Sequence, residues 1–288
     1  MERIIIGIDT EAASQVAVDW VIRRARQRPV TIRLVKAFDM LIDAPLRDED
    51  LLDRTKHRIE AAVPGASVET VLIDGSIMEA LVGQSESADL AVLGYHRRHP
   101  VLSTLSGALP GRFAARSHCA TVIVPEDWEP REGSIVLGVG DDEVTDTATE
   151  FALREAQHPR RELEIVHAWQ LPTPSWDAVG ALIASADDLH DAHRDILASV
   201  TERVRETHPA LEIRDTLAEG PAAAALLGAA REAELIVLGT HRRGPLTGLI
   251  LGSTALDLLP QSGVPVCIVP LLAPLTPASG VLSTFSAE

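Results

Sequence analysis

Short apolar runs alternate along this chain with longer segments whose apolar residues recur at helical spacing. Residues 4–9 (IIIGID) form the first run, and the segment after it is apolar at Ala17, Trp20, Val21 and Ala25, which is one stripe of a 3.6-residue helix. Runs this short and this apolar are typical of strands that are buried on both faces. The pattern therefore predicts a mostly parallel sheet between two layers of helices.

The same pattern occurs twice. Residues 4–9 return as residues 135–140 (IVLGVG) at an offset of 131, and beyond the second strand the offset becomes 145. The helical stripe matches Ala148, Phe151, Ala152 and Ala156. Residues 32–38 match residues 163–169, residues 90–94 match residues 235–239, and residues 122–125 match residues 267–270. The chain thus contains two copies of one unit, and the second has about 14 additional residues after its second strand.

Each copy consists of five predicted strands that alternate with four helices, which implies right-handed crossovers. We expect an α/β fold of two doubly wound domains, each a five-stranded parallel sheet with helices on both faces. The first domain should cover residues 1–126 and the second domain residues 134–272, with a short polar linker at 127–133 and a tail at 273–288. Such a linker holds the domains close together, and the composition of the tail predicts that it is mobile.

One helix of the second copy has a clear predicted stripe. Leu189, Ile196, Val200 and Val204 are apolar at helical spacing within an otherwise charged segment. We expect these four residues to face the sheet and the charged residues to face water.

The composition excludes several classes of protein. The chain has 26 Lys and Arg against 42 Asp and Glu, a formal charge of −16, and 3% aromatic residues, which opposes binding to a nucleic-acid backbone and to stacked bases. Two cysteines, Cys119 and Cys267, cannot form a disulfide framework and are expected to be buried thiols in a reducing compartment. There is no apolar run long enough for a membrane span and no signal-peptide pattern. We expect a soluble, cytoplasmic protein that binds neither nucleic acid nor a membrane.

The candidate chemistry lies in the loop after the fourth strand. In the second copy this loop runs from Gly239, at a strand end, to Gly252, Ser253 and Thr254, where a helix begins. Glycine lets a ligand approach the backbone, and the free N–H groups of a helix start favour an anion. In an open parallel sheet the ligand crevice lies at the carboxyl ends of the strands, at the point where the winding reverses. In this fold that point would lie between strand one and strand four, which would then be neighbours. Tight turns and an ordinary helix cap would explain the same residues without a ligand.

These loops resemble those of the universal stress protein family in its tandem form, and the resemblance covers residues 1 to about 272. Nucleotide-binding members carry Gly-x2-Gly-x9-Gly-[Ser/Thr] here. The corresponding residues are Gly239, Arg242, Gly252 and Ser253 in the second copy and Gly94, Arg97, Gly107 and Ala108 in the first. Both copies replace the second glycine by arginine, and the first also lacks the hydroxyl. The resemblance implies the HUP type of fold that adenine-nucleotide alpha-hydrolases share.

The resemblance implies further site residues. The family's aspartate near the nucleoside is Asp9 in the first copy, whereas the second copy has Gly140 followed by Asp141. The remaining transferred residues are Gly7 and Gly138 beside the nucleoside, Ala37 and Ala168 near the adenine, and Leu93 and Leu238 at the end of strand four.

The arginines leave two alternatives open. Arg97 with Arg98, and Arg242 with Arg243, could reach inward as charge-assisted phosphate ligands, or they could fill the pocket or point to solvent. Because they are local positive charges in a chain of net charge −16, they favour anion binding. The intact Gly252-Ser253-Thr254 makes the second copy the better candidate site.

The resemblance implies a stress-response protein that binds an adenine nucleotide, ATP with or without Mg²⁺, and acts through conformation or partner binding. Family members pair through their last strands, so residues 122–124 and 267–269 should adjoin, and a homodimer or an unidentified protein partner is compatible with this. The chain has neither a P-loop nor an identifiable general base, which favours binding with at most weak ATPase activity. The alternative is a nucleotide-free scaffold whose partner surfaces are the acidic helices and residues 172–186.

Three histidines lie near the predicted strand ends. His96 and His241 each follow a strand-end glycine by two residues. A role near phosphate is conceivable, but we expect both side chains to face water. His167 lies on a predicted strand and is expected to be a hydrogen-bonded core residue.

Two more histidines occur on the charged helix. His190 and His193, with Asp187 and Asp191, could bind a metal from one side of the helix. Such a cluster is more often a solvated helix face, which is what we expect here.

Overall fold

Strands and helices alternate along both halves of the chain, as the sequence predicts. The structure, a computed structural model, describes residues 1–9, 12–38, 45–96, 109–140, 145–157, 160–171, 186–240 and 251–271. The first domain consists of β1 (Glu2–Gly7), α1 (Ala12–Ala25), β2 (Val30–Phe38), α2 (Pro45–Ala62), β3 (Ser67–Asp74), α3 (Ile77–Ser85), β4 (Leu90–Tyr95), α4 (Leu109–Ala114) and β5 (Ala120–Pro125). The second consists of β6 (Ser134–Val139), α5 (Thr145–Gln157), β7 (Leu163–Trp169), α7 (Ala186–Thr207), β8 (Ile213–Glu219), α8 (Ala222–Ala229), the 3-10 turn η2 (Ala230–Glu232), β9 (Ala233–Gly239), α9 (Ser253–Leu258) and β10 (Val266–Val269).

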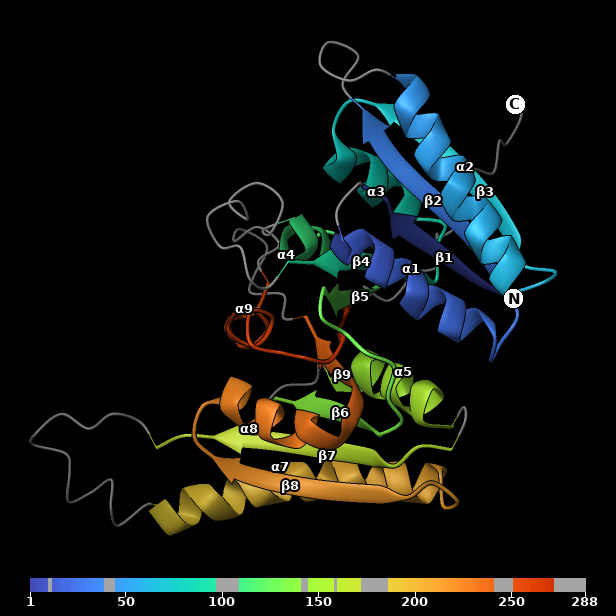
Figure 1. Cartoon of the computed structure of the whole chain (residues 1–288). Coiled ribbons are helices and arrows are strands. Elements are labelled where there is room, and N and C mark those ends of the chain that lie inside the picture. Colours follow the sequence, from blue (N-terminus) through green and yellow to red (C-terminus); the bar gives the residue numbers. More distant parts are fainter. Residues whose placement is uncertain are drawn as a thin grey trace, which may run out of the picture.

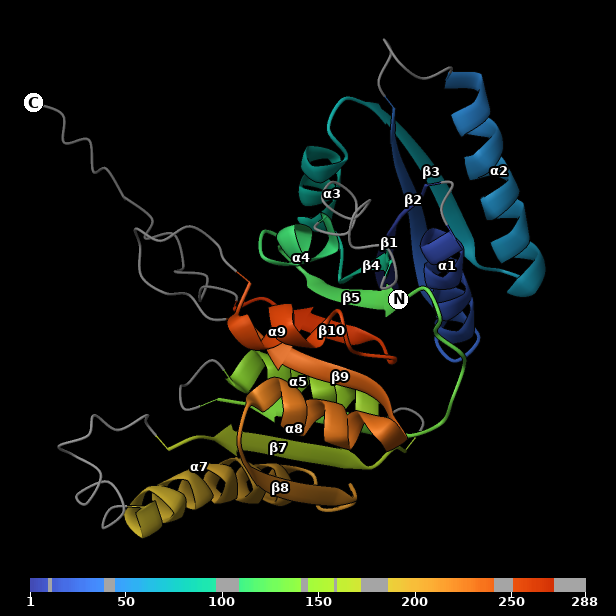
Figure 2. The ribbon, with the colours of Figure 1, turned by 60° about the vertical axis from the view of Figure 1, so that its left-hand side comes forward.

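The ten strands of the described residues form one sheet, in the order β3-β2-β1-β4-β5-β10-β9-β6-β7-β8. Every neighbouring pair within a domain is parallel, and β1 lies between β2 and β4 as β6 lies between β7 and β9. This confirms the predicted fold class and the predicted place of strand one beside strand four. The two domains meet where β5 and β10 pair antiparallel, so the last strands adjoin as the resemblance implied (Figures 1 and 2).

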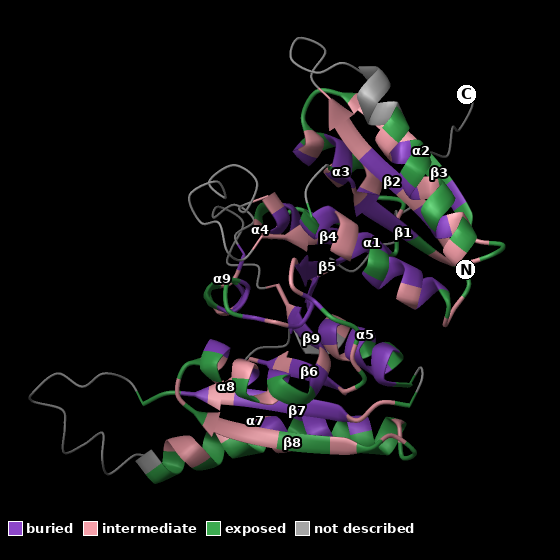
Figure 3. Cartoon of the chain, in the orientation of Figure 1, coloured by how far each residue is buried: buried purple, intermediate pink, exposed green. Residues whose placement is uncertain are grey.

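Helices cover both faces of the sheet. The apolar cluster on one face contains residues of α1, α2, α5 and α7, and it continues from the first domain into the second. On the other face α3 and α4 pack over one cluster, and α8 and α9 pack over another. The strands in the middle of the sheet are buried, whereas the outer sides of α2 and α7 are exposed (Figure 3). None of the helices in the described ranges is apolar over the length that crossing a membrane requires.

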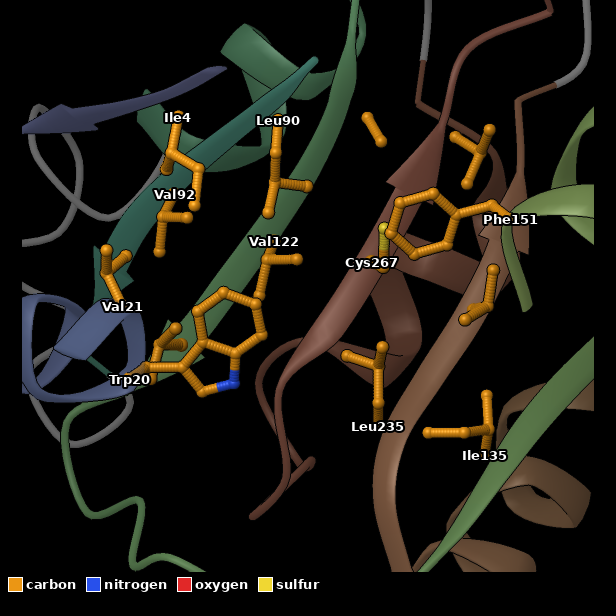
Figure 4. Packing of buried hydrophobic residues seen from close by; sticks show 14 of the residues in the cluster. Ile4, Trp20, Val21, Leu90, Val92, Val122, Ile135, Phe151, Leu235 and Cys267 are labelled. Carbon is orange, nitrogen blue, oxygen red and sulfur yellow. The ribbon is translucent and has the colours of Figure 1, made fainter. Parts of the chain in front are cut away.

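The continuous cluster closes the junction between the domains. Trp20 of α1 and Phe151 of α5 lie on either side of Val122 and Cys267, which occupy the paired strands (Figure 4). Trp128, in the expected linker, is 7% exposed and belongs to the same cluster. The domains therefore share one core, to which the expected linker contributes Trp128.

The predicted helix stripes are confirmed in α1 and α5 and need one correction in α7. All eight stripe residues of α1 and α5 are buried. In α7, Val200 and Val204 are buried as predicted, whereas Leu189 is only half-buried and Leu197 is buried in place of the half-buried Ile196. Spacings of four and three residues lead from Val204 to Val200 and Leu197, which places Ile196 beside the stripe rather than on it.

Candidate functional site

The carboxyl ends of the first and fourth strands adjoin in both domains. In the first domain β1 and β4 run in register, so Gly7 and Asp9 lie near Gly94. In the second domain the register pairs Gly138 with Leu238, the residue before Gly239. The structure thus brings together the strand-end residues that the sequence singled out, at the edge where parallel sheets bind ligands.

Two of the transferred glycines have a packing role that is the same in both domains. A Cβ atom on Gly7 would lie 2.6 Å from Cδ2 of Leu93, and one on Gly138 would lie 2.5 Å from Cδ2 of Leu238. Real Cβ atoms do not approach carbon this closely, so a side chain at either position would displace the end of the leucine from strand four, which fills this space in both domains. This packing forms the floor below the strand ends.

Gly94 is required by the start of helix α1. A Cβ atom at this position would lie 2.2 Å from the carbonyl oxygen of Ala13 and 2.7 Å from the backbone nitrogen of Ser14. Ser14 is buried, and its hydroxyl accepts a hydrogen bond of 3.1 Å from the backbone N–H of Asp9. The turn between β1 and α1 is therefore fixed by the protein's own contacts. It leaves the residue Asp9 exposed just beyond the end of β1.

The second domain presents a different arrangement at the same place. Gly140 stands where the first domain has Asp9. Helix α9 begins at Ser253, and the residue before it, Gly252, makes no side-chain cap. Ser253 is exposed and Thr254 is half-buried. The first turn of α9 thus offers backbone N–H groups and two hydroxyls that no capping side chain uses.

The equivalent helix of the first domain offers fewer donors. At the 145-residue offset, Leu109 and Pro110 of α4 correspond to Thr254 and Ala255 of α9. Proline has no backbone N–H, and leucine has no hydroxyl. The two domains therefore differ in their capacity to hold an anion, and the second has the larger one.

The expected adenine-side residues lie on neighbouring strands. Ala37 of β2 and Ala168 of β7 are both half-buried, and each precedes the last residue of its strand. They are adjacent to β1 and β6, respectively, through the sheet. In both domains, the strand beside the first strand thus has a small side chain at its second-to-last position.

Several predicted site residues lie outside the residues that the structure describes. These are Arg97, Arg98, Gly107, Ala108, Asp141, His241, Arg242 and Arg243. The expected tail and nearly all of segment 172–186 lie outside them too. Whether the arginines hold phosphate stays a prediction.

We expected the side chain of His96 to face water, but it does not. Its Nδ1 lies 2.9 Å from Oε2 of Glu126, and the two side chains are 17% and 16% exposed. Glu126 follows β5, which is the strand next to β4. The neighbouring strand end thus supplies an acidic partner from 30 residues away, which local sequence cannot reveal.

The structure also reveals a ring cluster that the sequence analysis missed. His167 is 1% exposed, its Nδ1 donates to the carbonyl oxygen of Val139 at 3.0 Å, and its Nε2 lies 2.9 Å from Nδ1 of His193. His193 stacks on Trp169 with ring centroids 5.4 Å apart, and His190 contacts the same ring edge-on. His167 is a hydrogen-bonded core residue as predicted.

The expectation that His190 and His193 face water is wrong. The stripe of α7 continues from Leu197 by steps of four and three residues to His193 and His190, so both rings face β7. That spacing was the available signal. Among the described residues no group of three metal-ligating side chains is close enough to bind a metal ion.

Both cysteines are buried, as expected. Burial raises the pKa of the Cys119 thiol to about 11 and raises the pKa of the Cys267 thiol well above its ordinary value. Thiols with raised pKa values are poor nucleophiles at neutral pH, which is consistent with a structural role.

Comparisons with known proteins agree with this architecture. The model of the universal stress protein family matches residues 1–125 and 133–270. Universal stress protein Rv1996 of Mycobacterium tuberculosis is 24% identical over 302 residues, covering 92% of this chain and 94% of the relative. The crystal structure of a universal stress protein from Archaeoglobus fulgidus has a TM-score of 0.69 at 18% identity and covers 94% of this chain and 98% of that chain.

A further solved relative is a universal stress protein in complex with cAMP, 25% identical, with a TM-score of 0.38 and coverage of 43% of this chain and 97% of that chain. The family model matches both halves of the present chain, which is the tandem arrangement. The chain therefore belongs to the universal stress protein family, in its form with two domains.

Proposed function

We propose that the second domain binds an adenine nucleotide, ATP in the first instance, at the carboxyl ends of β6 and β9, and that binding alters the protein's conformation or its association with a partner. The observation that carries the proposal is the start of α9 at Ser253, the first helix after β9 in the described part of the chain, with no side-chain cap. Uncapped N–H groups and the helix dipole attract a phosphate group at such a place. Arg242 and Arg243 would add charge to the same loop.

The asymmetry between the domains supports the choice of the second. The first domain has Pro110 where α9 has Ala255, and it lacks the hydroxyl that Ser253 supplies. A magnesium ion would arrive on the nucleotide's phosphates, because no group of metal-ligating side chains occurs in the described parts of the chain.

The test uses the full-length protein with millimolar ATP, AMP or cAMP. A ligand that binds only the folded state must raise the melting temperature, and nucleotide should be recovered from protein that is desalted and then heated. A missing thermal shift together with the absence of recovered nucleotide would favour the alternative, a scaffold with unused crevices.

Matched variants locate the site. The double variant Gly252→Val with Ser253→Ala should weaken ATP binding at least tenfold, since it removes a hydroxyl and places a branched side chain at the helix start. Gly252 has φ −59° and ψ 150°, which any residue adopts, so valine does not strain the backbone. Asp9→Ala is the control and should leave binding unchanged. The opposite order would place the working site in the first domain.

A further inference from the structure

A buried ion-pair cluster lies at the junction between the domains. Nη1 and Nη2 of Arg24, on α1, each donate to a carboxylate oxygen of Glu155, on α5, at 2.7 Å. Nε and Nη2 of Arg24 also donate to Glu2 of β1 at 2.8 Å. The side chains of Arg24 and Glu155 are only 5% and 8% exposed. Arg28 adds a further contact with Glu155 at 3.2 Å. One carboxylate of the second domain thus binds two arginines of the first.

Arg24 and Glu155 are equivalent positions of the repeat, since their numbers differ by 131. The paired strands have the same property, because Val122 lies opposite Cys267 at the 145-residue offset. Equivalent residues that face each other lie near a pseudo-twofold axis. In a symmetric pair of identical domains, a residue at this place would face its own copy. Here the two copies carry opposite charges instead.

A second contact across the junction also joins a glutamate of the second domain to an arginine of the first. Glu234 of β9 lies 2.7 Å from Arg161 of its own domain and 3.6 Å from Arg23 of α1. The first domain therefore contributes three arginines and one glutamate to the junction, Arg23, Arg24, Arg28 and Glu2. The second contributes two glutamates and one arginine, Glu155, Glu234 and Arg161. The two surfaces are complementary in charge, and neither is complementary to itself.

Burial makes this complementarity decisive. Burial lowers the pKa of Arg24, but the carboxylates of Glu155 and Glu2 outweigh it and raise that pKa above its ordinary value. Burial likewise raises the pKa of Glu155, but the charges of Arg24 and Arg28 lower it below the ordinary value. Both groups are thus charged at neutral pH. A buried charge that meets a like charge loses its partner and keeps its desolvation cost.

The apolar part of the junction does not discriminate between partners. The equivalent pairs Trp20 with Phe151 and Val122 with Cys267 are similar in size and polarity, and all four residues belong to one cluster. Two first domains or two second domains would bury such residues about as well. Discrimination must therefore come from the charged residues.

We infer that the β5 surface of the first domain is specific for a second-type domain, and that Arg24 and Glu155 reject the pairing of two like domains through β5 or β10. The chain accordingly closes on itself at this edge. Two copies of the chain that associate must use another surface.

The test exploits charge reversal in full-length protein. In Glu155→Arg both equivalent positions are arginine, and in Arg24→Glu both are glutamate. In neither variant can the two domains of one chain pair well with each other. When the two variants are unfolded and refolded together, each first domain finds a complementary second domain in the other chain. We expect a 1:1 complex with twice the mass of one chain, measured by light scattering after gel filtration. The same complex should be missing when either variant is refolded alone.

The control reverses an ion pair within one domain. Arg3 and Asp89 lie 2.7 Å apart, and their side chains are 58% and 43% exposed. Mixing Arg3→Glu with Asp89→Arg should give no complex beyond those of the separate chains. If either junction variant does not fold alone, recovery of folded protein only in the mixture supports the inference equally. A mixture that behaves as the sum of its separate components would overturn it.

Discussion

Val122 of β5 lies directly opposite Cys267 of β10, and the two residues are equivalent positions of the repeat. Val122 and Cys267 are both fully buried. Their pairing closes the edge of each five-stranded sheet, which would otherwise present unpaired backbone groups. The pseudo-twofold relation between the domains therefore holds both for the paired strand backbones and for the side chains around them.

The packing at this position can be tested by volume. Cys267→Val restores the residue that the first copy has and should change the free energy of unfolding by less than about 1.5 kcal/mol, because valine is apolar and only slightly larger. Val122→Ala leaves a cavity and should cost roughly 2 kcal/mol. Urea unfolding measures both values. Equal losses in the two variants would show that the site does not tolerate any change of shape.

The acid sensitivity of the protein should depend on Glu155. Because the pKa of Glu155 is lowered in the folded state by Arg24 and Arg28 against the effect of burial, its ionised form stabilises the fold above the ordinary carboxyl pKa of 4.5. That contribution is lost as the pH falls below this value. Glu155→Gln should lose about 3–5 kcal/mol at pH 7, since it breaks a buried pair. Its remaining stability should fall less steeply between pH 5 and pH 3.

The exposed pair of Arg3 and Asp89 provides the control for this pH dependence. The hydrogen bond from Arg3 lowers the pKa of Asp89 as well, but both side chains are exposed to solvent. Asp89→Asn should therefore cost less than about 1 kcal/mol at pH 7. A larger loss in Asp89→Asn than in Glu155→Gln would contradict the assignment of acid sensitivity to the junction.

The glycines of the first domain should respond to alanine in opposite ways. Gly94→Ala places a methyl group against the backbone of Ala13, so the start of α1 must shift, at a cost of about 1–3 kcal/mol. Gly83 lies within α3, and a Cβ atom there meets nothing within 4 Å. Gly83→Ala should stabilise the protein by about 0.5–1 kcal/mol, because alanine favours the helix. Thermal unfolding distinguishes the two signs.

The fold could be predicted from the sequence because its signals are local and occur twice. The strand-like run at residues 4–9, the stripe that includes Trp20, and their repeats fix the order of the elements. The role of Gly94 could not be predicted, since it depends on how closely α1 approaches β4. A glycine at a strand end is compatible with a ligand, a turn or a packed helix, and only the three-dimensional packing around it distinguishes these.

The junction shows a different limit of prediction. The repeat already made Arg24 and Glu155 equivalent positions, but nothing in the sequence places them near an axis. The arginine loops of both crevices lie outside the described residues. For this reason the proposed nucleotide site rests only on the strand ends and on the start of α9.

In the ring cluster between α7 and β7, His193 should contribute more to stability than His190. His193→Ala removes a hydrogen bond to the buried His167 and the ring that stacks on Trp169, and it should cost about 1–3 kcal/mol. His190→Ala is the matched control on the same helix. It removes only an edge contact with Trp169 and an exposed hydrogen bond with Arg194, so its loss should be smaller.

A third variant separates the two contributions of His193. His193→Phe keeps a ring over Trp169 but lacks the hydrogen bond to His167, so its free energy of unfolding should lie between those of the wild type and His193→Ala. Urea unfolding gives these energies, and the near-ultraviolet circular dichroism of Trp169 should change in His193→Ala more than in His193→Phe. If His190→Ala loses as much stability as His193→Ala, the inward hydrogen bond is not the stabilising contact. The helix would then be held by its apolar residues alone, of which Leu197, Val200 and Val204 are buried.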